Sequence, residues 1–88
     1  MSRGGGSRAW RGVVRATLQA KGTTCALCGL PGADSADHII PVAAGGSDQL
    51  LNLQPAHRRC NSQRQDMPLA RWYELHPLPK RAPPTREW

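Results

Sequence analysis

Two pairs of metal-binding residue types stand far apart in this chain of 88 residues. Cys25 and Cys28 are separated by two residues, and so are His57 and Cys60. Structural zinc takes four nitrogen or sulfur ligands in a tetrahedron, and such pairs place each half of the ligand set on one local turn. The set uses every cysteine of the sequence. We therefore predict a structural zinc site at these four positions.

Two other interpretations of these residues are open. Cys-x-x-Cys is also the spacing of a redox pair, although the long framework of a thioredoxin-like protein does not fit in so short a chain. In the second alternative, His57 is a residue of a helix surface and Cys60 is a small buried thiol. Gly29, directly after Cys28, favours a tight metal knuckle because glycine tolerates the turn.

A second group of polar residues has the types needed for phosphodiester hydrolysis. That reaction needs a base for the attacking water, a cation at the phosphate, and a group that holds the base in its working orientation. His38 is the best base, because an unperturbed imidazole titrates near neutrality. Asp37 and Asn61 offer oxygen donors suited to magnesium-like ions. Asn52 is placed to bond backbone groups across a loop and hold the hairpin that carries His38.

The adjacent Asp37-His38 pair is a weaker signal than the cysteine spacing. Such a pair is more often a local hydrogen bond than a catalytic site, and adjacent strand residues point to opposite faces. The two side chains would share a site only where the backbone distorts nearby. Asn61 directly follows Cys60, so a closed zinc site would fix its position.

Length and charge restrict the class of protein. A chain this short has room for one domain with a small core, so a metal ion would supply stability that burial does not. The formal net charge is +6, and the residues before Asp34 include basic side chains but no acidic one. This distribution is typical of a nucleic-acid binder, although from charge alone a solubilising surface is an equal alternative.

The compartment follows from cysteine usage and from the absence of apolar segments. The sequence shows no secretory signal and no segment that approaches the length of a membrane span. Three cysteines cannot all pair in disulfides. We therefore expect a cytoplasmic protein in a reducing environment, with no membrane partner.

The folded domain is predicted at residues 8–75, between a flexible basic arm at 1–7 and a basic, proline-rich tail at 76–88. Residues 8–20 show an apolar stripe at helical spacing, with Ser7 as a candidate cap and Gly22 as the stop. Another face of this helix is expected either to follow phosphates or to be solvated, and it carries Arg8, Arg11 and Arg15.

The candidate site residues fall on shorter elements. One strand is predicted at 36–40, ended by Pro41. A second is predicted at 49–54, either extended throughout or beginning with a helical turn, and ended by Pro55. Residues 57–66 are predicted to form a helix. The exposed face of that helix is expected to carry Arg58, Arg59, Gln63 and Arg64.

A last helix is predicted to run to Leu75. Asp66 is the candidate cap, and Pro68 would lie in the first turn, where proline is tolerated. The side chains expected to dock on the body of the domain are Leu69, Trp72 and Tyr73.

The order of these residues resembles the HNH endonuclease family. The pattern consists of Cys-x-x-Cys, Asp-His-Ile-Ile-Pro, Gly-Gly, Asn-Leu-Gln and His-x-x-Cys-Asn, and it covers residues 23–65. The resemblance implies a small α+β protein with the ββα-metal fold, an N-terminal helix and a zinc-stapled core. It implies His38 as the general base, Asp37 as a metal ligand and Asn52 as the residue that orients the loop. Asn61 stands where the family usually has a metal-binding histidine, and His57 replaces the commoner cysteine.

The activity that this resemblance implies is metal-dependent cleavage of DNA, as a nick or a double-strand break. Mg²⁺, or another divalent ion such as Mn²⁺ or Ni²⁺, would be bound by Asp37 and Asn61. We expect little sequence specificity and a strong salt dependence, because the candidate contacts go to phosphates. The residues expected to hold the DNA backbone are Arg8, Arg11, Arg15, Arg58, Arg59 and Arg64.

A catalytically weak, zinc-stapled nucleic-acid-binding module is the alternative function. The presence of both Asp37 and His38 favours the enzyme, because a binding module has no need for a base beside a metal ligand. Family analogy alone adds an accessory role in phage DNA packaging, with terminase subunits as partners in a bacterial cytosol.

Overall fold

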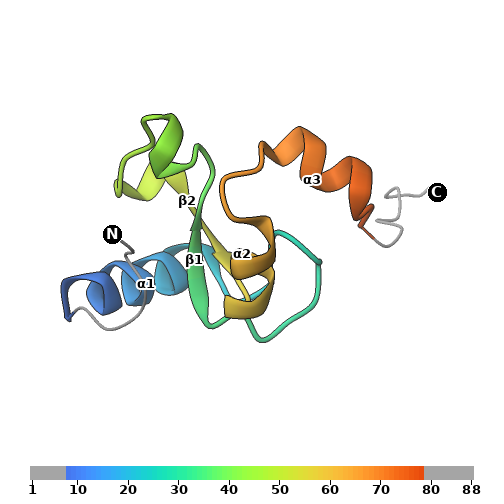
Figure 1. Cartoon of the computed structure of the whole chain (residues 1–88). Coiled ribbons are helices and arrows are strands. Elements are labelled where there is room, and N and C mark those ends of the chain that lie inside the picture. Colours follow the sequence, from blue (N-terminus) through green and yellow to red (C-terminus); the bar gives the residue numbers. More distant parts are fainter. Residues whose placement is uncertain (1–7, 79–88) are drawn as a thin grey trace.

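A short antiparallel hairpin lies between the helices and carries the candidate site residues (Figure 1). The computed structural model describes residues 8–78, so the predicted arm at 1–7 and most of the predicted tail lie outside the described residues. In chain order the elements are α1 (Arg8–Lys21), β1 (Ser35–His38), η1 (Val42–Ala44), η2 (Leu50–Asn52), β2 (Leu53–Ala56), α2 (Arg58–Arg64) and α3 (Leu69–Leu75). Both α1 and α2 contact the hairpin, and α3 lies at the opposite end of the molecule from α1. The predicted small α+β class is confirmed.

The hairpin pairs β1 with β2 in a register that sets Asp37 opposite Gln54 and His38 opposite Leu53. Both strands were predicted, but the second begins only at Leu53, after the helical turn η2, and the expectation that Pro55 ends it is wrong. Pro55 lies within β2 opposite Ala36. In a two-stranded sheet each strand has one edge without a neighbouring strand. A proline whose backbone nitrogen points to that edge therefore costs no ladder hydrogen bond.

The loop between the strands is closed by Asn52 and by two glycines. The Asn52 side chain accepts a hydrogen bond from the Ile40 N–H at 2.8 Å, and it donates to the carbonyl oxygens of Ile40 at 3.1 Å and Ser47 at 2.8 Å. Gly45 has φ 94°, a left-handed conformation that favours glycine. A Cβ atom at Gly46 would lie 1.7 Å from the Ile40 oxygen, so no other residue fits there. The predicted role of Asn52 in holding the hairpin loop agrees with these bonds.

Helix α1 packs against the hairpin through its apolar stripe, as predicted. Trp10 is buried and forms a core cluster with Ala36 and Leu53, against which Val13 and Val14 pack. The last turn is also tied to the hairpin loop. The Lys21 ammonium donates to the carbonyl oxygens of Leu50 at 2.7 Å and Leu53 at 2.6 Å. This contact fixes the distance between α1 and the start of β2.

Helix α3 closes a second core over the Cys25–Cys28 knuckle. Trp72 is buried, and its indole N–H donates to the Leu27 carbonyl at 2.9 Å. The Tyr73 hydroxyl donates to the Ala26 carbonyl at 2.6 Å. Docking of α3 through its aromatic side chains is therefore confirmed.

The predicted cap of α3 is wrong. Pro68 occupies the N-cap position, and no side-chain cap bond is formed there. The chain before it is turned by Arg64, whose carbonyl accepts from the Met67 N–H at 3.0 Å and whose Nε donates to the Met67 carbonyl at 2.7 Å. Asp66 lies within this turn and α3 begins only at Leu69, so Asp66 does not cap the helix.

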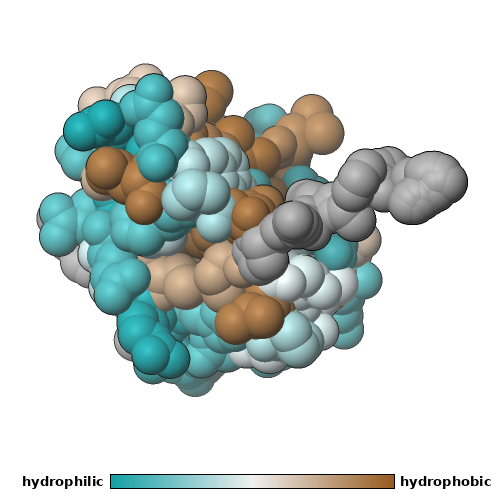
Figure 2. Space-filling model, turned by 90° about the vertical axis from the view of Figure 1, so that its right-hand side faces the viewer, coloured by the Kyte–Doolittle hydropathy of each residue, from teal (hydrophilic) through white to brown (hydrophobic). Residues whose placement is uncertain are grey.

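Hydrophobic side chains also reach the surface. Figure 2 shows brown hydrophobic areas beside teal hydrophilic ones on the face that it presents. The most exposed large hydrophobic residue of the described part is Leu51, at 88%. Leu51 lies in η2, at the turn that leads into β2.

Candidate functional site

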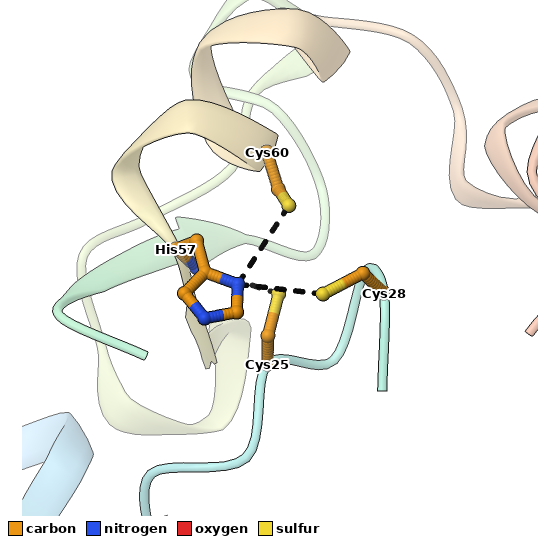
Figure 3. Close-up of side chains that lie close together, drawn as sticks. All are labelled: Cys25, Cys28, His57 and Cys60. Atoms are coloured by element: carbon orange, nitrogen blue, oxygen red, sulfur yellow. Dashed lines mark hydrogen bonds between the residues drawn. The ribbon is translucent and has the colours of Figure 1, made fainter. Parts of the chain in front are cut away.

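The four predicted zinc ligands come together in one cluster. One ligand atom from each of Cys25, Cys28, His57 and Cys60 lies within 4.8 Å of the others (Figure 3). His57 Nδ1 lies 3.3 Å from the Cys28 Sγ and 3.8 Å from the Cys60 Sγ. The knuckle before β1 and the first turn of α2 thus supply two donors each, as the spacing predicted.

Contacts around the cluster hold the imidazole of His57 in this orientation. The other ring nitrogen, Nε2, lies 3.0 Å from the Pro31 carbonyl oxygen. A carbonyl oxygen only accepts, so Nε2 carries the hydrogen and Nδ1 presents its lone pair to the sulfur atoms. The His57 backbone N–H also donates to the Cys25 Sγ at 3.3 Å. A ligating histidine is typically supported in this way.

The electrostatics of the cluster favour a bound cation. Burial, together with the neighbouring thiols of Cys25 and Cys28, raises the pKa of Cys60 to about 12. Burial also acts to raise the pKa of Cys25, but hydrogen bonds led by the His57 N–H outweigh it and leave that pKa below the ordinary value. Three thiols so close together cannot all ionise without a positive charge between them. The sulfur and imidazole donors therefore fit a structural metal ion such as zinc.

A cavity of about 970 Å³ opens between α1, β1, η1 and α2. Its lining includes three of the predicted catalytic residues, Asp37, His38 and Asn61. The walls also carry positive charge from α1 and α2, supplied by Arg11, Arg15 and Arg58. The hairpin, the helix that follows it and the first helix thus contribute to one concave surface.

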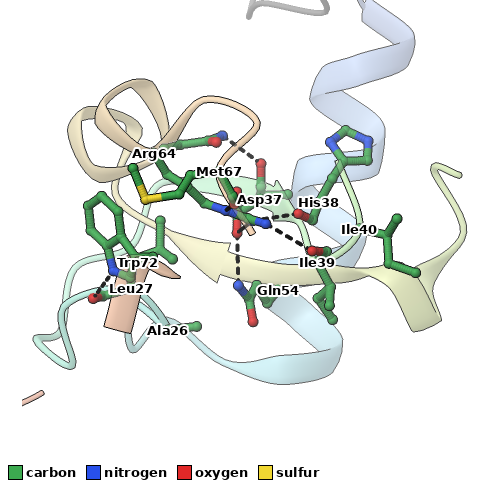
Figure 4. Close-up of polar contacts among 12 residues, drawn as sticks. Ala26, Leu27, Asp37, His38, Ile39, Ile40, Gln54, Arg64, Met67 and Trp72 are labelled. Atoms are coloured by element: carbon green, nitrogen blue, oxygen red, sulfur yellow. Dashed lines mark hydrogen bonds and ion pairs between the residues drawn. The ribbon is translucent and has the colours of Figure 1, made fainter. Parts of the chain in front are cut away.

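Asp37 is 1% exposed and is held by two long polar side chains. Its Oδ2 accepts from the Gln54 amide at 2.8 Å and from the Arg64 guanidinium at 2.5 Å (Figure 4). Burial raises the pKa of Asp37, while Gln54 and Arg64 oppose that rise. Oδ1 takes part in neither contact.

Arg64 was expected on the exposed face of α2, and that expectation is wrong. Its side chain is buried, with 1% of the residue exposed. Besides Asp37, the guanidinium bonds the carbonyl oxygens of His38 at 2.6 Å and Ile39 at 2.9 Å. Arg64 is therefore a buried link between α2 and the end of β1, and its guanidinium is not presented to a nucleic acid.

His38 points away from Asp37, as strand alternation requires (Figure 4). Its ring stacks on Trp10 of α1, with centroids 5.4 Å apart and planes inclined by 15°. Its Nε2 lies 2.7 Å from the Asp48 Oδ1. His38 of β1 and Asn61 of α2 nevertheless line the same cavity, because the cavity extends across the end of β1.

Asn61 is fixed by the backbone of the strand beside it. Its amide nitrogen donates to the Ala36 carbonyl at 2.9 Å. The amide oxygen is consequently the atom left to accept a hydrogen bond or to coordinate an ion. Asn52, by contrast, bonds the hairpin loop and does not line the cavity.

The predicted phosphate contacts differ in their placement. The arginines of α1 and the first two of α2 are exposed, and they are Arg8, Arg11, Arg15, Arg58 and Arg59. Arg11, Arg15 and Arg58 line the cavity, and Arg64 is excluded by its burial. The α2 backbone is anchored by Asp34, whose Oδ1 accepts from the Arg58 N–H at 2.9 Å.

Sequence reasoning missed the residues that hold the site residues in place. Trp10 was assigned to the core without its contact to His38, and Asp48 and Gln54 were given no role. For Arg64 a signal existed, because it follows Asn61 by three positions and therefore shares its helix face. Since Asn61 was expected to bind an ion together with Asp37 of the first strand, Arg64 should have been expected on that side of the helix too.

The comparison with protein families supports the resemblance to the HNH endonuclease family over part of the chain. The HNH endonuclease family model matches residues 25–66, which contain both cysteine pairs, the hairpin and α2. This segment of the chain is therefore similar to the HNH endonuclease domain. No curated protein and no solved structure matches it. Within residues 8–78, no helix combines the length and the apolar character needed to cross a bilayer.

Proposed function

We propose that this protein is a metal-dependent endonuclease that hydrolyses DNA phosphodiester bonds with His38 as the general base. One observation carries the proposal. An imidazole and two oxygen-bearing side chains, His38, Asp37 and Asn61, line a single cavity together with exposed arginines. In an HNH domain this combination provides a base, a place for a cation and a surface for phosphate.

His38 performs the proton step. Its ring is held by Trp10 and Asp48 at the edge of the cavity, where it takes a proton from a water molecule. The water oxygen then forms a bond to the phosphorus, and the bond from phosphorus to the 3′ oxygen breaks. The products are a 5′-phosphate and a 3′-hydroxyl, and the departing oxygen receives a proton from solvent.

Asp37 and Asn61 are the residues that would hold the catalytic ion. Carboxylate and amide oxygens are the donors that hard divalent cations such as Mg²⁺ and Mn²⁺ prefer, and the fixed amide nitrogen of Asn61 leaves its oxygen for that purpose. When bound, such an ion neutralises charge on the phosphate and on the leaving oxygen. Arg64 restricts Asp37 to offering one oxygen.

Arg11, Arg15 and Arg58 position the DNA backbone over the cavity. They lie on its walls, and Arg8 and Arg59 extend the basic surface along α1 and α2. Contacts of this kind neutralise phosphates without reading bases, so we expect weak sequence preference and affinity that falls steeply with salt.

Cleavage of supercoiled plasmid tests the proposal against the alternative of a binding module. The wild-type chain is compared with His38→Ala in the presence of Mg²⁺, Mn²⁺ or Ni²⁺, and DNA binding is measured in parallel. We expect wild-type cleavage, and a loss of about 10²- to 10⁴-fold in His38→Ala with binding retained. Binding without cleavage by the wild-type chain under every ion would leave the zinc-stapled binding module as the function.

A further inference from the structure

Asp48 has no part in the family pattern described above, yet it contacts the proposed base. Its Oδ1 lies 2.7 Å from the His38 Nε2, and the side chains are 36% and 13% exposed, respectively. His38 ends β1, and Asp48 lies ten positions later, within the hairpin loop. The contact therefore depends on how that loop is folded.

The loop holds Asp48 in place through its neighbours on both sides. Before it, the Ser47 carbonyl accepts from the Asn52 amide at 2.8 Å. After it, the Gln49 N–H donates to the Ser47 hydroxyl at 3.2 Å and the Gln49 carbonyl accepts from the Asn52 N–H at 2.8 Å. Asn52 thus fixes the backbone on which the carboxylate is presented.

The contact determines which nitrogen of His38 carries the hydrogen. A carboxylate only accepts hydrogen bonds, so Nε2 must donate, and in the neutral ring Nδ1 keeps its lone pair. Stacking on Trp10 fixes the plane of the ring, and the bond to Asp48 fixes its rotation within that plane. Together these contacts leave one tautomer in one orientation.

We propose that Asp48 is a positioning residue for DNA cleavage, which holds His38 in the Nε2–H tautomer so that Nδ1 is the atom that takes the proton from water. This inference rests on the proposed function. The proton moves from water to Nδ1, the imidazolium that forms is stabilised by the Asp48 carboxylate, and Asp48 itself remains ionised throughout.

A purely structural role of Asp48 predicts that its substitution lowers stability and leaves turnover per folded molecule unchanged. A partly exposed pair of this kind contributes little to stability, so its loss should leave the fold and the metal cluster intact. A positioning role predicts instead that turnover falls, while the affinity for DNA stays the same, because Asp48 acts on the base and the arginines hold the substrate.

The test compares Asp48→Ala with the wild-type chain in two measurements. In cleavage assays we expect kcat to fall about 10- to 100-fold with KM for DNA, zinc content and melting temperature unchanged. Nitrogen-15 NMR of the His38 ring, without DNA and at a pH where the ring is neutral, should show mainly the Nε2–H form in the wild type and a mixture in the variant. Glu74→Gln, which removes an exposed carboxylate on α3, is the control and should leave both measurements unchanged.

The outcomes separate this inference from the proposed function. An unaltered kcat or an unaltered tautomer population in Asp48→Ala would overturn the role of Asp48, while a cleaving wild-type chain leaves the nuclease proposal standing. A wild-type chain that cleaves no DNA would overturn both.

Discussion

The metal cluster and the proposed catalytic cavity meet at the Cys60–Asn61 bond but are built in different ways. In the cluster the functional atoms of Cys25, Cys28, His57 and Cys60 face one another within 4.8 Å. In the cavity each proposed catalytic side chain is held by a residue outside the proposed catalytic set. Arg64 holds Asp37, Asp48 holds His38, and the Ala36 backbone holds Asn61.

This difference separates a site that supports the fold from a site that depends on it. A bound ion would join the knuckle to α2, and Trp72 packs α3 over the same cluster. The cavity residues sit on β1 and α2, whose relative position is set by the cluster at one end and by Arg64 at the other. Damage to the cluster should therefore abolish cleavage, whereas loss of the His38 side chain from the cavity should spare the fold.

The largest expected effect comes from the cluster. Cys25→Ser should remove zinc and unfold the domain, because metal binding is part of the folding free energy and the whole stability of a domain is only about 5–15 kcal/mol. Zinc content and thermal unfolding measure this change. Gln63→Ala, at an exposed position of α2, should leave both at the wild-type level. A folded, zinc-containing Cys25→Ser chain would show that the metal cluster does not stabilise the fold.

Arg64→Met should have the next largest effect. It leaves the buried carboxylate of Asp37 without its cation, and breaking a buried pair costs about 3–5 kcal/mol. The free energy of unfolding in urea measures the loss, and Arg59→Met on the exposed side of the same helix should change it by less than about 0.5 kcal/mol. Equal effects at the two positions would contradict the buried link between α2 and β1.

Zinc affinity should rise with pH. The pKa of Cys60 is raised to about 12, so without metal this thiol is protonated at neutral pH and must lose its proton when the ion binds. For each proton released on binding, the apparent zinc affinity rises about tenfold per pH unit, as long as the pH lies below that pKa. Competition with a chelator between about pH 6 and about pH 8 measures how the zinc affinity changes with pH. An affinity that does not change with pH would argue against thiolate ligation by Cys60.

Tyr73→Phe should have the smallest effect. It removes only the hydroxyl that bonds the Ala26 carbonyl behind the knuckle, which contributes about 0.5–1.5 kcal/mol. Because α3 lies away from the cavity, the cleavage rate per folded molecule should not change. A reduced kcat at full folding would mean that α3 influences the catalytic residues directly.

The cluster could be predicted from the sequence, and most of the support of the cavity could not. Each half of the cluster lies on a local turn, so spacing alone specified it. The contact between Arg64 and Asp37 joins residues 27 positions apart, and the one between His38 and Asp48 depends on a loop closed by Asn52 and Gly46. Helical and strand periodicity contain no information about such loop geometry. Pro55 was mistaken for a strand end because proline usually ends ladder pairing, whereas here it pairs with Ala36 within β2 and its carbonyl accepts from the Ala26 N–H at 2.8 Å.

The most direct test measures zinc content and plasmid cleavage on the same preparation of His38→Ala. If the cluster supports the fold and the cavity performs the chemistry, the variant should retain the zinc of the wild-type chain and lose cleavage by about 10²-fold or more. A variant that keeps its zinc and cleaves at the wild-type rate would contradict the assignment of the cavity as the nuclease site.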